Sequence, residues 1–194
     1  MADIIPLFSK PVYVANNSNL KFDISAVEWI QNYTNFTSKN RNILPSIADA
    51  NTIGHLQQAI ADFFYGVLGV QQSTEIYITE SWLNKNLPGE HHHRHWHPNS
   101  IISAVVCLSA TEDTGALTFI TSAYESIEFE TTQANVYNSK SWSIKLKPND
   151  IVLFPSSVEH LVERNFSNTE RITLSFNTFV KGNINNLPYT ALEL

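Results

Sequence analysis

The chain has 194 residues and a mass of 21.9 kDa, enough for one folded domain with little left over. Hydrophobic residues make up 43% and charged residues 15% of it, a globular composition that excludes disordered and coiled-coil proteins. The formal net charge of −6 argues against a nucleic-acid backbone as partner. Cys107 is the single cysteine, which excludes an internal disulfide framework. Since the sequence also shows no secretory leader and no long apolar run, we expect a cytoplasmic protein without membrane attachment.

Hydrophobic periodicity near the N-terminus predicts two helices. Apolar residues recur at three-residue steps over residues 24–33, and a longer apolar stripe covers residues 53–68. We therefore expect a single domain over residues 1–194. In it, residues 1–70 give helical support, residues 71–180 form a β core, and residues 181–194 are a C-terminal tail.

After residue 70 the pattern becomes typical of β-strands. Alternating or β-branched segments predict strands at residues 75–83, 101–108, 116–120, 141–146, 150–154 and 171–179. Pro148-Asn149 is a turn signal before one of them, and asparagine tolerates a positive φ there. Strands this short, with no helical pattern between them, favour two facing antiparallel sheets. We expect a jelly-roll sandwich with the helices bracing one outer face.

Five of the seven histidines are clustered just before an expected strand. Residues two apart in an extended chain project to the same side, so His95 and His97 can present two imidazoles to one metal ion. His91 and His93 have the same spacing and stay an alternative. We favour the later pair because it adjoins the strand, whereas Pro88-Gly89 makes the earlier segment more mobile. The other interpretation is a polar, solvated loop that binds metal nonspecifically.

A third candidate ligand is His160, which follows the expected strand at residues 150–154 and a short loop. Two ligands hold a metal ion weakly, so a third is needed. A jelly roll can place this strand across from His95 and His97. On its own His160 would be taken as a structural histidine, but beside that pair a metal ligand is the better interpretation.

One late strand alternates polar and apolar residues, and Arg171, Thr173, Ser175 and Asn177 share its polar face. Such a face lies toward solvent, as in an ordinary outer strand, or toward a polar cavity. An arginine with a hydroxyl two residues on can bind a carboxylate through charge-assisted hydrogen bonds. We therefore expect Arg171 and Thr173 to bind an acidic ligand, with Ser175 and Asn177 as candidate pocket-lining residues.

Taken together, these segments resemble the iron(II)- and 2-oxoglutarate-dependent oxygenases, and among them a small group from phages and bacteria. The matching segments, in chain order, are Pro6–Pro11, Trp82-x-Asn84, His95–Ser100, Gly115–Phe119, Asp150–Pro155, His160 and Arg171-x-Thr173. No single motif is specific, but their order and spacing extend over nearly the whole chain. The resemblance implies a double-stranded β-helix, the jelly-roll fold that this superfamily shares with the cupins.

The resemblance also implies a site. His95, His97 and His160 would hold Fe(II). Arg171, helped by Thr173, would bind the far carboxylate of 2-oxoglutarate. Fe(II) and 2-oxoglutarate would then be the cofactors of a dioxygenase, of the hydroxylase type, that couples decarboxylation of 2-oxoglutarate to succinate with oxidation of a substrate C–H bond.

One departure from the family pattern concerns the metal ligands. The usual triad has two histidines and one carboxylate, whereas His97 stands at the carboxylate position. Glu90, Asp113 or a water could complete the ligand set. Tyr77 and Asn84 precede the histidine cluster and are candidates to line the cosubstrate pocket; sheet packing and a solvated amide are the other interpretation of these two.

Three other functions stay open at this point. A cupin-type metal enzyme without 2-oxoglutarate has similar histidine spacing but gives Arg171 no task. A non-catalytic phage or bacterial binding module would keep the fold without turnover. A zinc hydrolase has only the histidines in its favour. The substrate, a small molecule or a protein, and the oligomeric state also stay open, since fold does not determine function.

Overall fold

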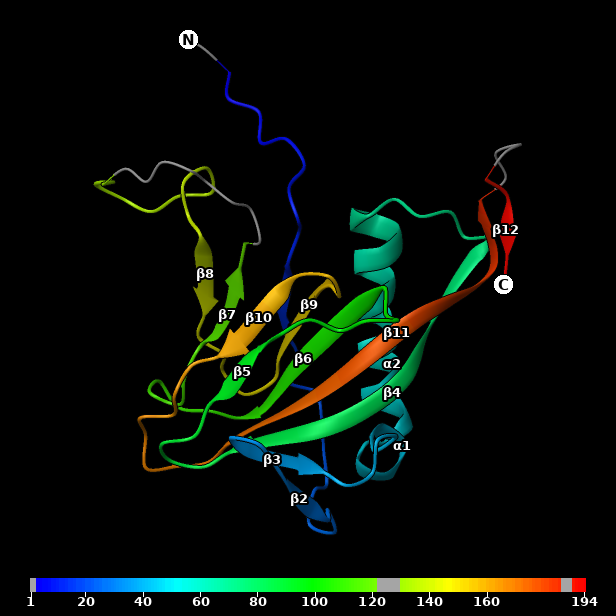
Figure 1. Cartoon of the computed structure of the whole chain (residues 1–194). Helices are drawn as coiled ribbons and strands as arrows, with labels where there is room; N and C mark the ends of the chain where they lie inside the picture. The colour runs from blue at the N-terminus through cyan, green and yellow to red at the C-terminus, as the bar shows by residue number, and fades with distance from the viewer. Residues whose placement is uncertain (1–2, 122–129, 186–189) are drawn as a thin grey trace.

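The computed structural model describes residues 3–121, 130–185 and 190–194, which form two antiparallel β-sheets (Figure 1). In spatial order the larger sheet contains β1 (Tyr13–Asn16), β9 (Asp150–Pro155), β6 (Ile102–Ser109), β11 (Arg171–Asn185), β4 (Thr74–Asn86), β3 (Asn35–Ser38) and β2 (Trp29–Asn32), with β12 (Leu192–Glu193) paired to β11. The smaller sheet contains β5 (His92–His95), β10 (Glu159–Val162), β7 (Leu117–Ile120) and β8 (Ser141–Ile144). The long strand β11 lies between β6 and β4 and is the central strand of the larger sheet.

Two apolar clusters lie on the two faces of the larger sheet. The cluster between the sheets contains Val105, Cys107, Leu117, Phe119, Val152, Phe154 and Val162. The second cluster packs alternate residues of the same strands, such as Val106 and Leu153, against Leu56 and Phe63 of the helical segment. Because side chains of a strand alternate between faces, both faces of β6 and β9 are apolar and buried. The larger sheet therefore packs against the smaller sheet on one face and against the helical segment on the other.

The helical layer covers the outer face of the larger sheet (Figure 1). It consists of α1 (Leu44–Ile47), α2 (Ala50–Ala61) and a π-helical turn η1 (Asp62–Val67). The side chain of Asp49 caps α2 by accepting a hydrogen bond from the Thr52 N–H at 2.7 Å. This confirms the helix expected over residues 53–68. No helix among the described residues has the length and apolar character needed to cross a membrane.

The helix expected over residues 24–33 is wrong. Residues 29–32 form β2, which pairs with β3, and β3 in turn pairs with β4 at the edge of the larger sheet. Of the apolar side chains that recur at three-residue steps, Ile24 and Val27 pack on the apolar cluster, whereas Ile30 and Tyr33 are exposed, so they do not form one face. Residues 1–70 therefore support the core with strands as well as helices.

All six expected strands are present, as β4, β6, β7, β8, β9 and β11. Asn149 has a φ of 71°, which confirms the turn expected before β9. The described strands that the pattern did not predict are β1, β2, β3, β5, β10 and β12, which have two to four residues each. Among these, β5 and β10 position the histidines.

Candidate metal and cosubstrate site

Pairing of β5 with β10 in the smaller sheet brings the histidines together. His95 is directly opposite His160 in the antiparallel register. His97 follows two residues after β5, and its backbone N–H donates a hydrogen bond to the Ser156 carbonyl at 3.0 Å. That bond ties His97 to the loop before β10. Two short strands thereby join parts of the chain that are more than 60 residues apart.

His95, His97 and His160 form a compact cluster. One ring nitrogen of each lies within 4.8 Å of those of the other two. The ring centroids are 4.3 Å apart for His95 and His160, 5.1 Å for His97 and His160, and 5.2 Å for His95 and His97. Imidazole nitrogens bind divalent transition metals at about 2.0–2.1 Å, so small rotations of the rings suffice to surround one ion.

Each of the three rings is oriented by a hydrogen bond from its Nδ1 atom. The Nδ1 atom of each ring lies near an oxygen: 2.7 Å from the His93 carbonyl for His95, 2.6 Å from Asn177 Oδ1 for His97, and 3.0 Å from the Val158 carbonyl for His160. Carbonyl oxygens only accept, so each Nδ1 carries the proton and donates it. The lone pairs of the three Nε2 atoms remain for a metal ion, as in metal-bound histidines.

A hydrogen-bond chain that runs from buried Ser103 to the partly exposed Glu80 holds Asn177 in place behind His97. Ser103 Oγ donates to Asn177 Oδ1 at 2.8 Å, and Asn177 Nδ2 donates to Glu80 Oε1 at 2.8 Å. Glu80 also pairs with Arg41 at 3.1 Å. Because Asn177 Nδ2 is engaged by a carboxylate, its Oδ1 must face His97. This network sets the tautomer of the His97 ring.

An Asn177→Leu variant is expected to bind Mn(II) about 10- to 100-fold more weakly than the wild type, because His97 loses the acceptor that fixes its ring. Isothermal titration calorimetry on protein freed of metal measures this. Asn183→Leu, on the same strand but beyond the site, is the matched control. Equal affinities of the wild type and Asn177→Leu would contradict the role of Asn177.

Burial keeps these imidazoles neutral. It lowers the pKa of His95 to about 4 and that of His160 to about 3. It also lowers the pKa of His97, although the hydrogen bond to Asn177 acts in the raising direction. The neutral ring is the form that coordinates a metal ion. The cluster therefore has its ligand atoms free of protons at neutral pH.

Lowering the pH from 7 to 5 is expected to reduce the free energy of unfolding of the metal-free protein by about 2–4 kcal/mol. The unfolded chain takes up protons at His95 and His160 below their ordinary pKa of about 6.5, whereas the folded chain does so only near pH 4 and pH 3. Stability is therefore present above pH 6.5 and lost as the pH falls. Urea unfolding at both pH values measures the loss, which should be smaller in a His160→Leu variant; an equal or larger loss there would contradict the assignment.

Arg171 is a buried cation on the inner face of β11. Its side chain is 1% exposed, and the next two residues of that face, Thr173 and Ser175, line the cavity beside the histidines. Burial lowers the pKa of Arg171 to about 10, so the guanidinium stays charged at neutral pH. Its Nε and Nη2 atoms have no hydrogen-bond partner in the part of the chain that the structure describes. The ionisable group whose charge would raise the pKa of Arg171 is the Cys107 thiol. This thiol is neutral at pH 7, because burial raises its own pKa to about 11.

Two buried asparagines of β4 lie beside Arg171. Asn86 is directly opposite Arg171, and Asn84 is opposite Thr173. Asn84 Nδ2 donates to Ser175 Oγ at 3.1 Å. Asn84 Oδ1 and both polar side-chain atoms of Asn86 have no partner within the described residues. Since buried polar atoms are normally paired, these groups have the chemistry to bind an acidic ligand that accepts from the guanidinium and from an amide.

The cluster opens on one side into a cleft. A small inner cavity reaches from the histidines to Thr173 and Ser175. An outer cleft of about 320 Å³ shares five residues with it, namely Trp82, Asn84, His92, His95 and His97. The outer cleft is also lined by Glu80, Asn177 and the exposed Trp96. The inner cavity is narrow, about 20 Å³, and the outer cleft leads from the imidazoles to solvent.

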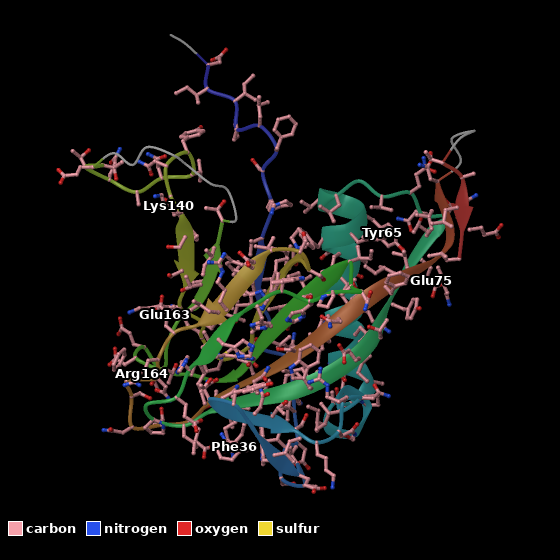
Figure 2. The ribbon with its side chains drawn as sticks, in the orientation of Figure 1. Phe36, Tyr65, Glu75, Lys140, Glu163 and Arg164 are labelled. Atoms are coloured by element: carbon pink, nitrogen blue, oxygen red, sulfur yellow. The ribbon has the colours of Figure 1, made fainter. Side chains whose placement is uncertain are left out.

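The expectation that Tyr77 lines the pocket is wrong. Tyr77 is 41% exposed and borders a different cavity together with Tyr65 and Glu75. Figure 2 shows Tyr65 and Glu75 on the opposite side of the molecule from Glu163 and Arg164, which follow β10. The reason is the length of β4, whose first residues extend past the smaller sheet and lie outside the sandwich.

Neither carboxylate proposed to complete the ligand set joins the described histidine clusters. Glu90 accepts a hydrogen bond from the Leu87 N–H at 2.8 Å within the loop before β5, and Asp113 lies in the loop before β7. The sequence interpretation also missed Glu80 and Asn86. The alternation of β4 could have indicated both residues, because Glu80 and Asn86 lie on the same face of the strand as Asn84.

The structure is an antiparallel jelly-roll sandwich in which three imidazoles able to hold a metal ion lie near a buried guanidinium. The chain matches, over residues 80–177, the family model described as "Putative 2OG-Fe(II) oxygenase", which is slightly more than half of its length. The protein belongs to this family. Fe(II) and 2-oxoglutarate are the family's cofactors, and the three Nε2 atoms and Arg171 have the donor chemistry that these two require. No curated protein sequence matches the chain.

Solved structures show the same fold. A 2OG-Fe(II) oxygenase family oxidoreductase from Burkholderia pseudomallei is 14% identical, with a TM-score of 0.57 over 79% of this chain and 72% of the other. A prolyl-4-hydroxylase from Pseudomonas putida is 19% identical, with a TM-score of 0.51 over 77% of each chain. HygX from Streptomyces hygroscopicus, solved with nickel, 2-oxoglutarate and hygromycin B, is 10% identical, with a TM-score of 0.51 over 80% and 74%. The fold is therefore the double-stranded β-helix.

Proposed function

We propose that the protein is an Fe(II)- and 2-oxoglutarate-dependent dioxygenase that oxidises, by hydroxylation, a substrate held in the outer cleft. In this proposal His95, His97 and His160 hold the metal ion through Nε2. Arg171 binds the far carboxylate of 2-oxoglutarate with the help of Thr173. Once bound, the two cofactors supply the family's oxidising chemistry, in which 2-oxoglutarate and dioxygen become succinate and carbon dioxide as the substrate is oxidised.

The observation that carries the proposal is the buried guanidinium of Arg171. An unpaired buried charge is costly, and proteins rarely keep one without a function. Here the charge lies on the strand face that leads to the three imidazoles. A dicarboxylic acid bound between Arg171 and the imidazoles can pair one carboxylate with Arg171 and direct the other end at the metal ion. A cupin without 2-oxoglutarate would leave this cation unused.

The positive charge of the site also favours 2-oxoglutarate as the ligand. Three neutral imidazoles around a divalent ion leave two positive charges, and Arg171 adds a third. This site attracts a dianion more strongly than the usual triad, in which a carboxylate removes one charge. The hydroxyl of Thr173 and the amide of Asn86 offer further donors at the carboxylate end. The chain's residues therefore bind, orient and neutralise 2-oxoglutarate.

The direct test is succinate formation from 2-oxoglutarate in the presence of Fe(II), ascorbate and air, without added substrate. Slow turnover that requires Fe(II) is expected in the wild type and is expected to be absent in Arg171→Met. Arg164→Met, which changes an exposed arginine, is the matched control and should behave as the wild type. If the wild type with Fe(II) forms no more succinate than the metal-free protein, the chain is a non-catalytic module of the same fold.

The substrate and location are part of the proposal. The outer cleft is bordered by Trp82, Trp96 and the Arg41–Glu80 pair, so it suits a small molecule or a protein side chain with apolar and polar parts. The single cysteine, Cys107, is buried and free, which fits a reducing cytoplasm.

A further inference from the structure

A second group of three histidines lies beside the first. One ring nitrogen each of His92, His93 and His95 lies within 4.8 Å of the others. The ring of His92 stacks on that of His95 with centroids 4.5 Å apart, and the His93 ring is 5.0 Å from His92 and 5.3 Å from His95. These spacings are similar to those of the first cluster, so the second group could also surround an ion.

A β-bulge explains why three residues of one short strand converge. His95 pairs with His160, but His92 pairs with Val162, so three steps on β5 match two steps on β10. The extra residue places His92 and His95 on the same face, which regular alternation would prevent. Bulges re-aim side chains in this way and are common beside functional sites.

The second group is open to solvent. His93 is exposed and His92 is half-buried, and both border the outer cleft. The Tyr33 ring packs edge-on against the His93 ring with centroids 5.8 Å apart, which supports it from the outer side. Neither His92 nor His93 has a side-chain hydrogen bond to another described residue. The ring nitrogens of both are therefore available to an ion that enters from the cleft.

His95 belongs to both groups but has one free lone pair. Its Nδ1 donates to the His93 carbonyl at 2.7 Å, which leaves Nε2 as the ligand atom for either ion. One imidazole nitrogen binds one metal ion. The two groups therefore cannot both hold an ion through three histidines at the same time.

We propose that His92, His93 and His95 form a second site for a divalent transition-metal ion, occupied in alternation with the site of His95, His97 and His160. Three imidazole ligands favour Zn²⁺, Cu²⁺, Ni²⁺ and Co²⁺ over Mg²⁺ and Ca²⁺. An ion in the outer position withdraws His95 from the inner one. This inference concerns metal binding alone and holds whether or not the protein turns over 2-oxoglutarate.

The first test isolates the outer site with Co²⁺ as the probe. In His160→Leu the inner group has two histidines left, and we expect one Co²⁺ to bind with a visible ligand-field spectrum. Adding His93→Ala should weaken that binding at least about 100-fold, because a third ligand is lost. Adding His91→Ala instead, next to the site but outside it, should leave the affinity within about threefold. Equal effects of His93→Ala and His91→Ala would overturn the proposal.

The second test uses the unaltered inner site, so it does not depend on the folding of His160→Leu. Electron paramagnetic resonance of the wild type with one equivalent of Cu²⁺ should show two sets of hyperfine values, one for each position. The exposed variant His93→Ala should show one set. A single spectrum that His93→Ala leaves unchanged would overturn the proposal. Simultaneous tight binding of two ions by the wild type would overturn the alternation.

Discussion

An Arg171→Met variant is expected to bind 2-oxoglutarate about 100- to 1,000-fold more weakly than the wild type, since it loses a buried charge-assisted pair. The same variant, free of metal and 2-oxoglutarate, is expected to be more stable than the wild type by about 1–3 kcal/mol. The reason is that Arg171 is 1% exposed and has two nitrogen atoms without partners among the described residues. Methionine fills a similar volume without the charge.

Two measurements that compare Arg171→Met with the wild type test these two expectations. Calorimetric titration with 2-oxoglutarate in the presence of Mn(II) gives the affinity, and urea unfolding without ligand gives the free energy of unfolding. Arg164→Met, at an exposed position after β10, should change neither by more than about 0.5 kcal/mol. Loss of stability in Arg171→Met together with unchanged 2-oxoglutarate affinity would show that the guanidinium has a structural role instead.

His160→Leu is expected to abolish the dependence of 2-oxoglutarate binding on metal. In the wild type, Mn(II) should raise the affinity for 2-oxoglutarate at least about tenfold, equivalent to about 1.4 kcal/mol, because the ion attracts the near end of the dianion. The His160 ring packs between Phe119 and Phe154, with centroids 6.2 and 4.7 Å away. Leucine suits these apolar surroundings, so the fold should persist while the ligand is lost.

The measurement is titration with 2-oxoglutarate with and without Mn(II). His55→Leu, on α2 away from both histidine clusters, is the matched control and should keep the full metal dependence. Metal dependence retained by His160→Leu would show that the ion near 2-oxoglutarate is held elsewhere. The outer position of His92, His93 and His95 would then be the first place to look.

The predicted strands were recognised because alternating or β-branched side chains extend over five or more residues of the sequence, although β7 and β8 themselves have four residues each. β2 could not, since its four residues follow a three-residue apolar recurrence that imitates a helix. Its position depends on pairing with β3, which is a tertiary contact. The same limit applies to β5 and β10, whose four residues each carry too little pattern to be recognised.

The candidate site could likewise be predicted in part. His95, His97, His160 and Arg171 were visible because their residue types stand out against apolar strands. The positions of Asn86 and Glu80 followed the alternation of β4 and could have been read from it. The part played by His92 could not, because it depends on a bulge in β5 that reverses the expected face. Tyr77 was misplaced because the sequence does not show where the smaller sheet ends.

A crystal structure with Mn(II) and 2-oxoglutarate tests the central claim most directly. We predict one ion about 2.0–2.2 Å from the Nε2 atoms of His95, His97 and His160. We also predict that the far carboxylate of 2-oxoglutarate lies within hydrogen-bond distance of Arg171. A carboxylate bound away from Arg171, or an ion that does not contact these three nitrogen atoms, would contradict the account.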